Sequence, residues 1–288
     1  MNKLVEILKL TRIEHSIILV IAVLAAEILT KGIPSLPILA LSLITPIFIS
    51  MGSFSINDYY DVKVDKLNRK IRPLVTKTIS MKEALYITYS CMIIGIVASL
   101  LINFYCFVIA LIFAVLALLY SYRLKETLFI GNAYIALSMV IPFIFGVYVV
   151  SSSLNNAIIL VSIMIFLSGL AREIHGTIRD YLGDKKIRDV KTIPAVIGLK
   201  NAAILALILY IFAIALSVFL FTSVNPFRYN LVYGLLILIV DLMLAYVAIR
   251  SLAVKQKSYY RLTRNLSLGA MGLALIAILL SSILTITL

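Results

Sequence analysis

Nine long apolar segments constrain this chain of 288 residues more than any other feature of its sequence. A helix needs about 20 apolar residues to cross the hydrocarbon core of a bilayer, and segments near that length recur along the whole chain. We predict spans at residues 16–30, 36–56, 82–102, 105–122, 130–150, 157–174, 201–222, 229–249 and 266–287. Hydrophobic residues make up 62% of the sequence and charged residues only 14%, which leaves too much apolar surface for a soluble domain of this size. The sequence therefore predicts an all-α, polytopic membrane protein, and it excludes a soluble enzyme, a disordered protein and a disulfide scaffold.

The positions of the charged residues support this number of spans. With nine spans, the N-terminus and the linkers after the second, fourth, sixth and eighth spans lie on one side of the membrane. All Lys and Arg residues except Lys31 and Arg228 fall on that side, and so do all acidic residues except Glu27 and Asp241. The positive-inside rule places that side, with the N-terminus, in the cytoplasm and the C-terminus outside. The net charge of +13 then reflects membrane topology, and we predict no nucleic-acid partner.

A cluster of acidic residues follows the second predicted span. Asp58, Asp61 and Asp65 recur with the spacing i, i+3 and i+7, so they share one helical stripe if the helix continues beyond the membrane. Asn57 stands one turn before Asp61 and adds a neutral oxygen. Clustered oxygen ligands without Cys or His suit a hard cation such as Mg²⁺. The alternative is a solvated polar cap on the helix.

A second acidic pair, Asp180 and Asp184, follows the sixth span with the spacing i, i+4. An even number of spans separates the two clusters, so both are expected at the same membrane surface. A Lys-Thr-Ile tripeptide follows each cluster, at residues 77–79 and 191–193. We therefore predict a single domain over residues 1–288 with a weak tandem repeat of spans one to four and five to eight.

Basic residues beside acidic ones indicate a metal–anion complex as the ligand. A diphosphate bridged by Mg²⁺ needs carboxylates for the metal and Arg or Lys for its remaining oxygens. The available donors are Arg69, Arg72, Lys77, Arg123 and Lys125. A diphosphate on a lipidic tail suits such a site, because its head lies in the polar loops and its tail among the apolar helices.

These motifs resemble those of the UbiA-type intramembrane prenyltransferases. The first family signature is similar to Asn57-Asp58-x-x-Asp61-x-x-x-Asp65 with Arg72-Pro73-Leu74 behind it, and the second is similar to Asp180-x-x-x-Asp184. Tyr120-Ser121 matches a smaller signature. The resemblance implies nine transmembrane helices around a central cavity with cytoplasmic cap loops, and transfer of a prenyl group from an allylic diphosphate to a lipid-like acceptor.

The resemblance also implies residue roles. Asn57, Asp61 and Asp65 would hold one Mg²⁺, with Asp58 close by, and Asp180 and Asp184 would hold another. Arg72 and Lys125 would neutralise the diphosphate, helped by Arg69, Lys77 and Arg123. The catalytic set is then Asp58, Asp61, Asp180 and Lys125, and Tyr120 joins the diphosphate-binding residues.

Several other polar and aromatic side chains are candidates either for the site or for a structural role. Tyr120, Tyr122, Phe143 and Phe145 offer π-faces to an allylic cation, although each ring is also expected as ordinary helix packing. His15 is a candidate base for the acceptor hydroxyl. We expect His175 and the intramembrane Asp241 to be structural, and Cys91 and Cys106 to be buried, inert thiols.

Within the family, the first motif and Arg172-Glu173-Ile174 resemble the archaeal digeranylgeranylglyceryl phosphate synthases. That resemblance implies transfer of a geranylgeranyl group from its diphosphate to geranylgeranylglyceryl phosphate, in ether-lipid synthesis. Arg179, Leu182 and His15 depart from the usual pattern, and this leaves the acceptor open. An aromatic prenyltransferase acting on a hydroxybenzoate- or naphthoate-like quinone precursor is the alternative, and a cation-coupled transporter is a remote one.

Overall fold

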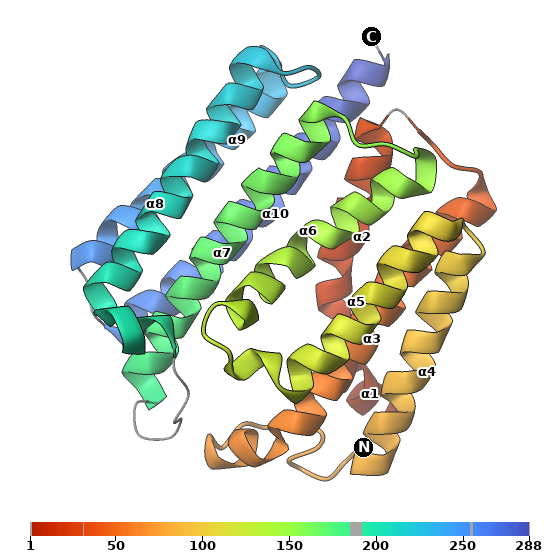
Figure 1. Cartoon of the computed structure of the whole chain (residues 1–288), viewed down its shortest axis with the longest axis vertical. Helices are drawn as coiled ribbons and strands as arrows, with labels where there is room; N and C mark the ends of the chain where they lie inside the picture. The colour runs from red at the N-terminus through yellow and green to blue at the C-terminus, as the bar shows by residue number, and fades with distance from the viewer. Residues whose placement is uncertain (1, 31, 185–191, 254–255, 288) are drawn as a thin grey trace.

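The protein forms a bundle of long helices (Figure 1). The computed structural model describes residues 2–30, 32–184, 192–253 and 256–287. Within these ranges the chain is helical without any strand. The elements are α1 (Lys3–Thr11), α2 (Ile13–Leu29), α3 (Leu36–Leu67), α4 (Met81–Leu100), α5 (Phe104–Tyr122), the 3-10 helix η1 (Leu124–Glu126), α6 (Ile130–Val150), α7 (Asn156–Asp184), α8 (Ile193–Ser223), α9 (Leu231–Ala253) and α10 (Lys257–Thr287).

Every predicted span forms a helix, and together these helices are α2 to α10. Helices α3 to α10 are each long and apolar enough to cross a membrane, whereas α2 has only 17 residues. Large apolar side chains such as Leu235, Leu242 and Ile249 on α9 are exposed on the outside of the bundle. Exposed apolar surface on this scale suits lipid rather than water. The chain is therefore a multi-pass membrane protein.

Four helix boundaries differ clearly from the predicted ones, each by more than two helical turns. α3 continues to Leu67 and α7 to Asp184, whereas the predicted spans end at residues 56 and 174. α10 begins at Lys257, nine residues or so before the predicted span. The apolar pattern marks only the part of a helix inside the membrane, and polar turns continue beyond it. α8 begins at Ile193, ahead of the predicted residue 201, and Gly198 interrupts its path with a φ of +82°, a conformation that glycine adopts at little cost.

The C-terminal ends of α3 and α7 lie at the same end of the bundle (Figure 1). The N-terminus lies at this end too, and the C-terminus lies at the opposite end. The predicted convergence of the two acidic segments on one face is confirmed. Lys31 and the basic residues at 185–191 lie outside the described residues, as does the side chain of Asp184.

A cap of non-spanning segments covers this end of the bundle. Glu6 on α1 accepts hydrogen bonds from Lys9 and from Thr78, at 2.7 Å each, and Thr78 belongs to the loop between α3 and α4. These bonds hold the pKa of the Glu6 carboxyl below its usual value, because they stabilise its charged form. Leu10 packs with Leu74 and Ile79 beneath them. Both polar and apolar contacts thus fix α1 to the α3–α4 loop.

Candidate active site

A cavity of about 460 Å³ lies between the helices. Helices α2, α3, α5, α6, α7, α9 and α10 supply most of its lining, and Ala213 of α8 and Arg12, between α1 and α2, add to it. The polar lining residues at the end that carries the acidic segments include Arg12, His15, Asn57, Tyr120, Ser121, Arg172 and Arg264. We call this end the cavity mouth. Away from it the lining is mostly apolar, and Asp241 there accepts a hydrogen bond of 2.6 Å from Ser217. The predicted central cavity is confirmed.

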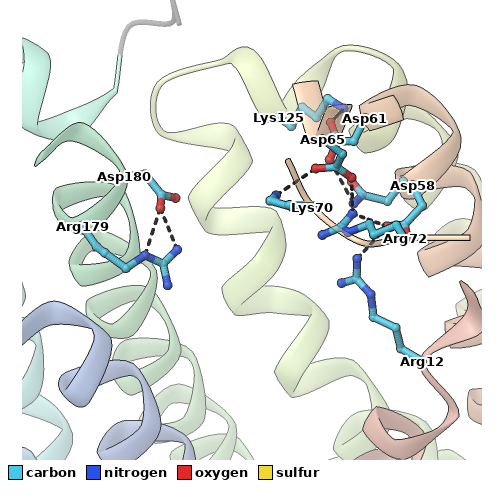
Figure 2. A network of polar contacts seen from close by, with 10 residues as sticks. Arg12, Asp58, Asp61, Asp65, Lys70, Arg72, Lys125, Arg179 and Asp180 are labelled. Carbon is cyan, nitrogen blue, oxygen red and sulfur yellow. Dashed lines mark hydrogen bonds and ion pairs between the residues drawn. The ribbon is translucent and has the colours of Figure 1, made fainter. Parts of the chain in front are cut away.

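The continuation of α3 beyond the membrane places its three aspartates on one side of the helix (Figure 2). Asp58 accepts hydrogen bonds from Arg12 and from Arg72, each at 2.6 Å, and its side chain is only 2% exposed. Arg72 also pairs with Asp65 at 2.6 Å, and Lys70 pairs with Asp65 at 2.8 Å. Two carboxylates are therefore buried in a network of ion pairs, which compensates their loss of hydration.

Asp61 has a different environment. Its Oδ1 accepts a hydrogen bond of 2.6 Å from Lys125, which lies in η1. Its Oδ2 accepts a longer bond of 3.3 Å from the side chain of Asn57, which lines the cavity. Asp61 thus connects the cavity lining to a basic side chain from the α5–α6 connection.

The second acidic segment contributes Asp180 near the end of α7. This carboxylate is half exposed and accepts two hydrogen bonds from Arg179, at 2.9 and 2.8 Å. Figure 2 shows the pair on a different helix from the α3 cluster and across from it. Asp184 is the last residue of α7, one turn farther along.

The five basic residues predicted to bind the diphosphate fall into two groups, according to whether they contact the aspartates. Arg72 and Lys125 contact the aspartates, as described above. Arg69, Lys77 and Arg123 are exposed, and none of the ion pairs among the described residues includes them. Arg69 and Lys77 also have positive φ angles, of 51° and 60°, and so belong to turns of the cap.

Three aromatic rings form a stack on the cavity wall. Tyr120 stacks on Tyr134 with ring centroids 4.5 Å apart, and Tyr134 stacks on Phe113 at 5.8 Å. All three residues line the cavity, as does Phe145. Tyr134 and Phe113 were not predicted from the sequence, because apolar helices are rich in such rings and spacing alone does not show which of them face inward.

Two other aromatic candidates lie elsewhere, and His175 is a packing residue as expected. Phe143 is fully buried in the helix core, and Tyr122 is 63% exposed. Neither lines the cavity. The His175 ring lies between those of Tyr210 and Tyr260, with centroids at 5.6 and 5.7 Å.

Four basic residues at the mouth were absent from the predicted site. Arg12 and Lys70 pair with the α3 aspartates, and Arg172 and Arg264 line the cavity. The sequence attributes their charge to topology, since loops near a membrane are basic anyway. The one available signal is position: Arg264 lies nearly a turn closer to the apolar part of α10 than Arg261 does.

The side chains at the mouth fit Mg²⁺ by their chemistry. They offer carboxylate and amide oxygens, which suit this ion better than zinc or iron. Within the described part of the chain, no three His, Cys, Asp or Glu side chains are grouped closely enough to hold a metal alone. Mg²⁺ commonly takes one or two carboxylates and completes its shell with water and substrate phosphate oxygens. A metal at this mouth would therefore bind together with a phosphorylated substrate.

Comparison with known proteins identifies the class to which this fold and site belong. Residues 18–268 match the UbiA prenyltransferase family, so the chain belongs to that family. It is an intramembrane prenyltransferase.

Among individual relatives, several digeranylgeranylglyceryl phosphate synthases are similar to this chain in sequence. The chain is 38% identical to the synthase of Archaeoglobus fulgidus over 239 residues, which cover 83% of this chain and 81% of that protein. The identity to the Methanosphaera stadtmanae synthase is 33%, covering 77% of this chain and 80% of that one.

Solved structures share the fold. One from work on digeranylgeranylglyceryl phosphate synthase in membranes has a TM-score of 0.80 and 26% identity, covering 98% of this chain and 99% of that one. A UbiA homologue from Archaeoglobus fulgidus, bound to GPP and Mg²⁺, has a TM-score of 0.66 and 21% identity, covering 95% and 99%.

Proposed function

We propose that this chain transfers a geranylgeranyl group from geranylgeranyl diphosphate to the free hydroxyl of geranylgeranylglyceryl phosphate, forming an ether bond of archaeal lipids. The observation that carries the proposal is the cavity itself. It has an apolar interior for a prenyl tail and a mouth where carboxylates and basic side chains alternate. The names of the relatives described above support this choice of substrates.

The donor would bind with its diphosphate at the mouth. Asn57, Asp61 and Asp65 would hold Mg²⁺ on the α3 side, and Asp180 and Asp184 would do so on the α7 side. Bound Mg²⁺ supplies positive charge to the leaving diphosphate. Arg72 and Lys125 form ion pairs with the α3 carboxylates, and they would bind the remaining phosphate oxygens. Asp58 holds Arg12 and Arg72 in place.

Breaking the bond between the first prenyl carbon and oxygen leaves an allylic cation, which water would quench. The apolar lining excludes water from the reacting carbon. The stacked rings of Tyr120 and Tyr134 offer π-faces to the positive charge. The acceptor oxygen then bonds to the carbon and loses its proton. His15 lines the mouth and is the candidate to accept that proton.

The membrane orientation follows from the same geometry. Nearly all basic residues in the described part of the chain belong to segments on the side of the mouth, so we propose that the mouth and the N-terminus face the cytoplasm and the C-terminus faces outward. A transporter would place its ionisable groups near the middle of the membrane. Here the α3 aspartates, Asp180 and their basic partners lie together at the mouth (Figure 2).

A competition between acceptors tests the proposed function. Purified protein is incubated with geranylgeranyl diphosphate and Mg²⁺, and receives geranylgeranylglyceryl phosphate and 4-hydroxybenzoate in parallel. We expect diphosphate release and a product mass of the doubly prenylated glyceryl phosphate, with neither in the Asp61→Asn variant. A prenylated hydroxybenzoate alone would contradict the proposed acceptor and support the aromatic alternative.

A further inference from the structure

A group of arginines lies at the cavity mouth on the side away from the α3 cluster. Arg172 on α7 and Arg264 on α10 both line the cavity, from helices that pack against each other. Arg179 lies about two helical turns beyond Arg172 on α7, within electrostatic range of Arg264. The donor site described above uses neither Arg172 nor Arg264.

These arginines are incompletely paired. Arg172 forms an ion pair of 2.8 Å with the adjacent Glu173 through one terminal nitrogen, but its buried Nε has no hydrogen-bond partner. Arg264 takes part in none of the ion pairs found within 4.0 Å among the described residues. A buried donor without a partner is costly in a folded protein. Guanidinium groups within range of one another also repel, and a bound anion removes both costs.

The basic residues of the α3 cluster are in a different state. Arg12, Arg72 and Lys125 each contact an aspartate at 2.6 Å. Their charge is matched by side chains that would share a metal–diphosphate complex with them. The cavity mouth therefore has one basic wall whose side chains each contact an aspartate. Its other wall has three arginines but, among the described side chains, only Glu173 and Asp180 to compensate them. Two basic walls accommodate two anionic groups.

We propose that Arg172 and Arg264 bind the phosphate group of the lipid acceptor and thereby select an acceptor that carries one. This inference rests on the proposed function, because it assigns the second substrate's head group to a wall of the same cavity. A phosphate monoester presents several oxygens to the planar guanidinium fork, which binds them in pairs. The acceptor's hydroxyl would then lie between this wall and the donor's first carbon.

The test compares Arg264→Gln with Arg261→Gln in steady-state kinetics. Arg261 lies on the same helix, is exposed and does not line the cavity, so it is the matched control. We expect Arg264→Gln to raise the KM for the phosphorylated acceptor by about ten-fold or more, as for loss of a charge-assisted hydrogen bond. The KM for geranylgeranyl diphosphate should stay unchanged. Arg264→Lys should fall between the two, because it keeps the charge but loses the fork.

A second acceptor without phosphate, geranylgeranylglycerol, separates binding from folding. The wild type should use it poorly, and Arg264→Gln should use it as well as the wild type does, since no phosphate contact is left to lose. A variant that merely misfolds would lose activity toward both acceptors and would also unfold at a lower temperature. In that case Arg264→Lys and Arg172→Gln must still show the acceptor-specific rise in KM for the inference to hold.

Two results would overturn the inference. One is an unchanged KM for the phosphorylated acceptor in Arg264→Gln and Arg172→Gln. The other is a rise in the KM for the donor instead, which would assign these arginines to the diphosphate. Both results leave the proposed function intact. A wild type that transfers no prenyl group to geranylgeranylglyceryl phosphate would instead overturn the proposed function, and this inference with it.

Discussion

The three aspartates of α3 have the same side chain but different surroundings. Asp58 is almost fully buried and is held by two arginines, whereas Asp61 is 16% exposed and touches the cavity-lining Asn57. Burial of a carboxylate is tolerated only with such partners. Removing the Asp58 carboxylate would leave Arg12 without its ion pair and Arg72 with Asp65 alone. Asp58 thus orients basic groups before a substrate arrives, which reduces reorganisation during the reaction. Asp61, which reaches the cavity lining through Asn57, is one of the carboxylates that we propose as ligands of Mg²⁺.

A single glycine offers the means to test the depth of the cavity. Gly272 lines it on α10, eight residues from Arg264, and a Cβ atom there would meet no atom within 4 Å. Eight helical residues correspond to a depth of about 12 Å. Gly272→Phe should therefore block a long tail but leave room for a short one. We expect kcat/KM to fall at least about ten-fold for geranylgeranyl diphosphate relative to dimethylallyl diphosphate.

The control for this change is Ile276→Phe on the same helix. Ile276 is 41% exposed on the bundle surface and lines no part of the cavity. It should leave the preference for chain length unchanged. An equal loss with both donors in Gly272→Phe would show that the tail does not pass this residue.

At the scale of elements, α3 and α7 share a design. Each continues beyond the apolar span, ends in aspartates and packs against the following helix. Because both acidic segments are helical, aspartates three or four residues apart lie on one side of their helix. A loop would not keep these residues on one stripe. The tandem repeat of spans one to four and five to eight stays a prediction, and this shared design supports it.

The contact between α2 and α6 provides a prediction about stability. A Cβ at Gly146 on α6 would lie 2.5 Å from the carbonyl oxygen of Val23 on α2, and backbone cannot move aside easily. Gly146→Ala should lower the free energy of unfolding by about 1–3 kcal/mol, as overpacking does. Thermal unfolding in detergent measures the change.

Gly176→Ala on α7 is the matched control, because a Cβ there meets nothing within 4 Å. It should be neutral or stabilising by up to about 1 kcal/mol, since alanine favours helix more than glycine does. Equal stability of the two variants would mean that α2 and α6 do not approach closely at Gly146.

At the scale of the whole molecule, the sequence predicts what depends on one-dimensional patterns. Apolar length locates the nine predicted spans. The even number of spans between the two acidic clusters predicts that the ends of α3 and α7, which carry Asp61 and Asp180, lie at one end of the bundle, as Figure 1 shows for the two helix ends. The partners of those residues depend on how distant helices pack, which spacing does not encode. Arg12, Tyr134 and Arg264 therefore emerge only from the structure, from helices far apart in the chain.

The central claim is that the ends of α3 and α7 hold one metal–diphosphate group together. The direct test measures, by calorimetry, the binding of a geranylgeranyl diphosphate analogue with and without Mg²⁺. In this analogue, sulfur replaces the oxygen between the first prenyl carbon and phosphorus, the bond that breaks in the reaction. Asp61→Asn, Asp180→Asn and the double variant are compared, with Glu83→Gln as an acidic control at the same end of the bundle.

We predict Mg²⁺-dependent binding in the wild type and in the control, and binding at least about ten-fold weaker in each single variant. The double variant should lose less than the sum of the two single losses in free energy, because the two sites share one ligand. Wild-type affinity in Asp180→Asn, or additive losses in the double variant, would contradict a shared site.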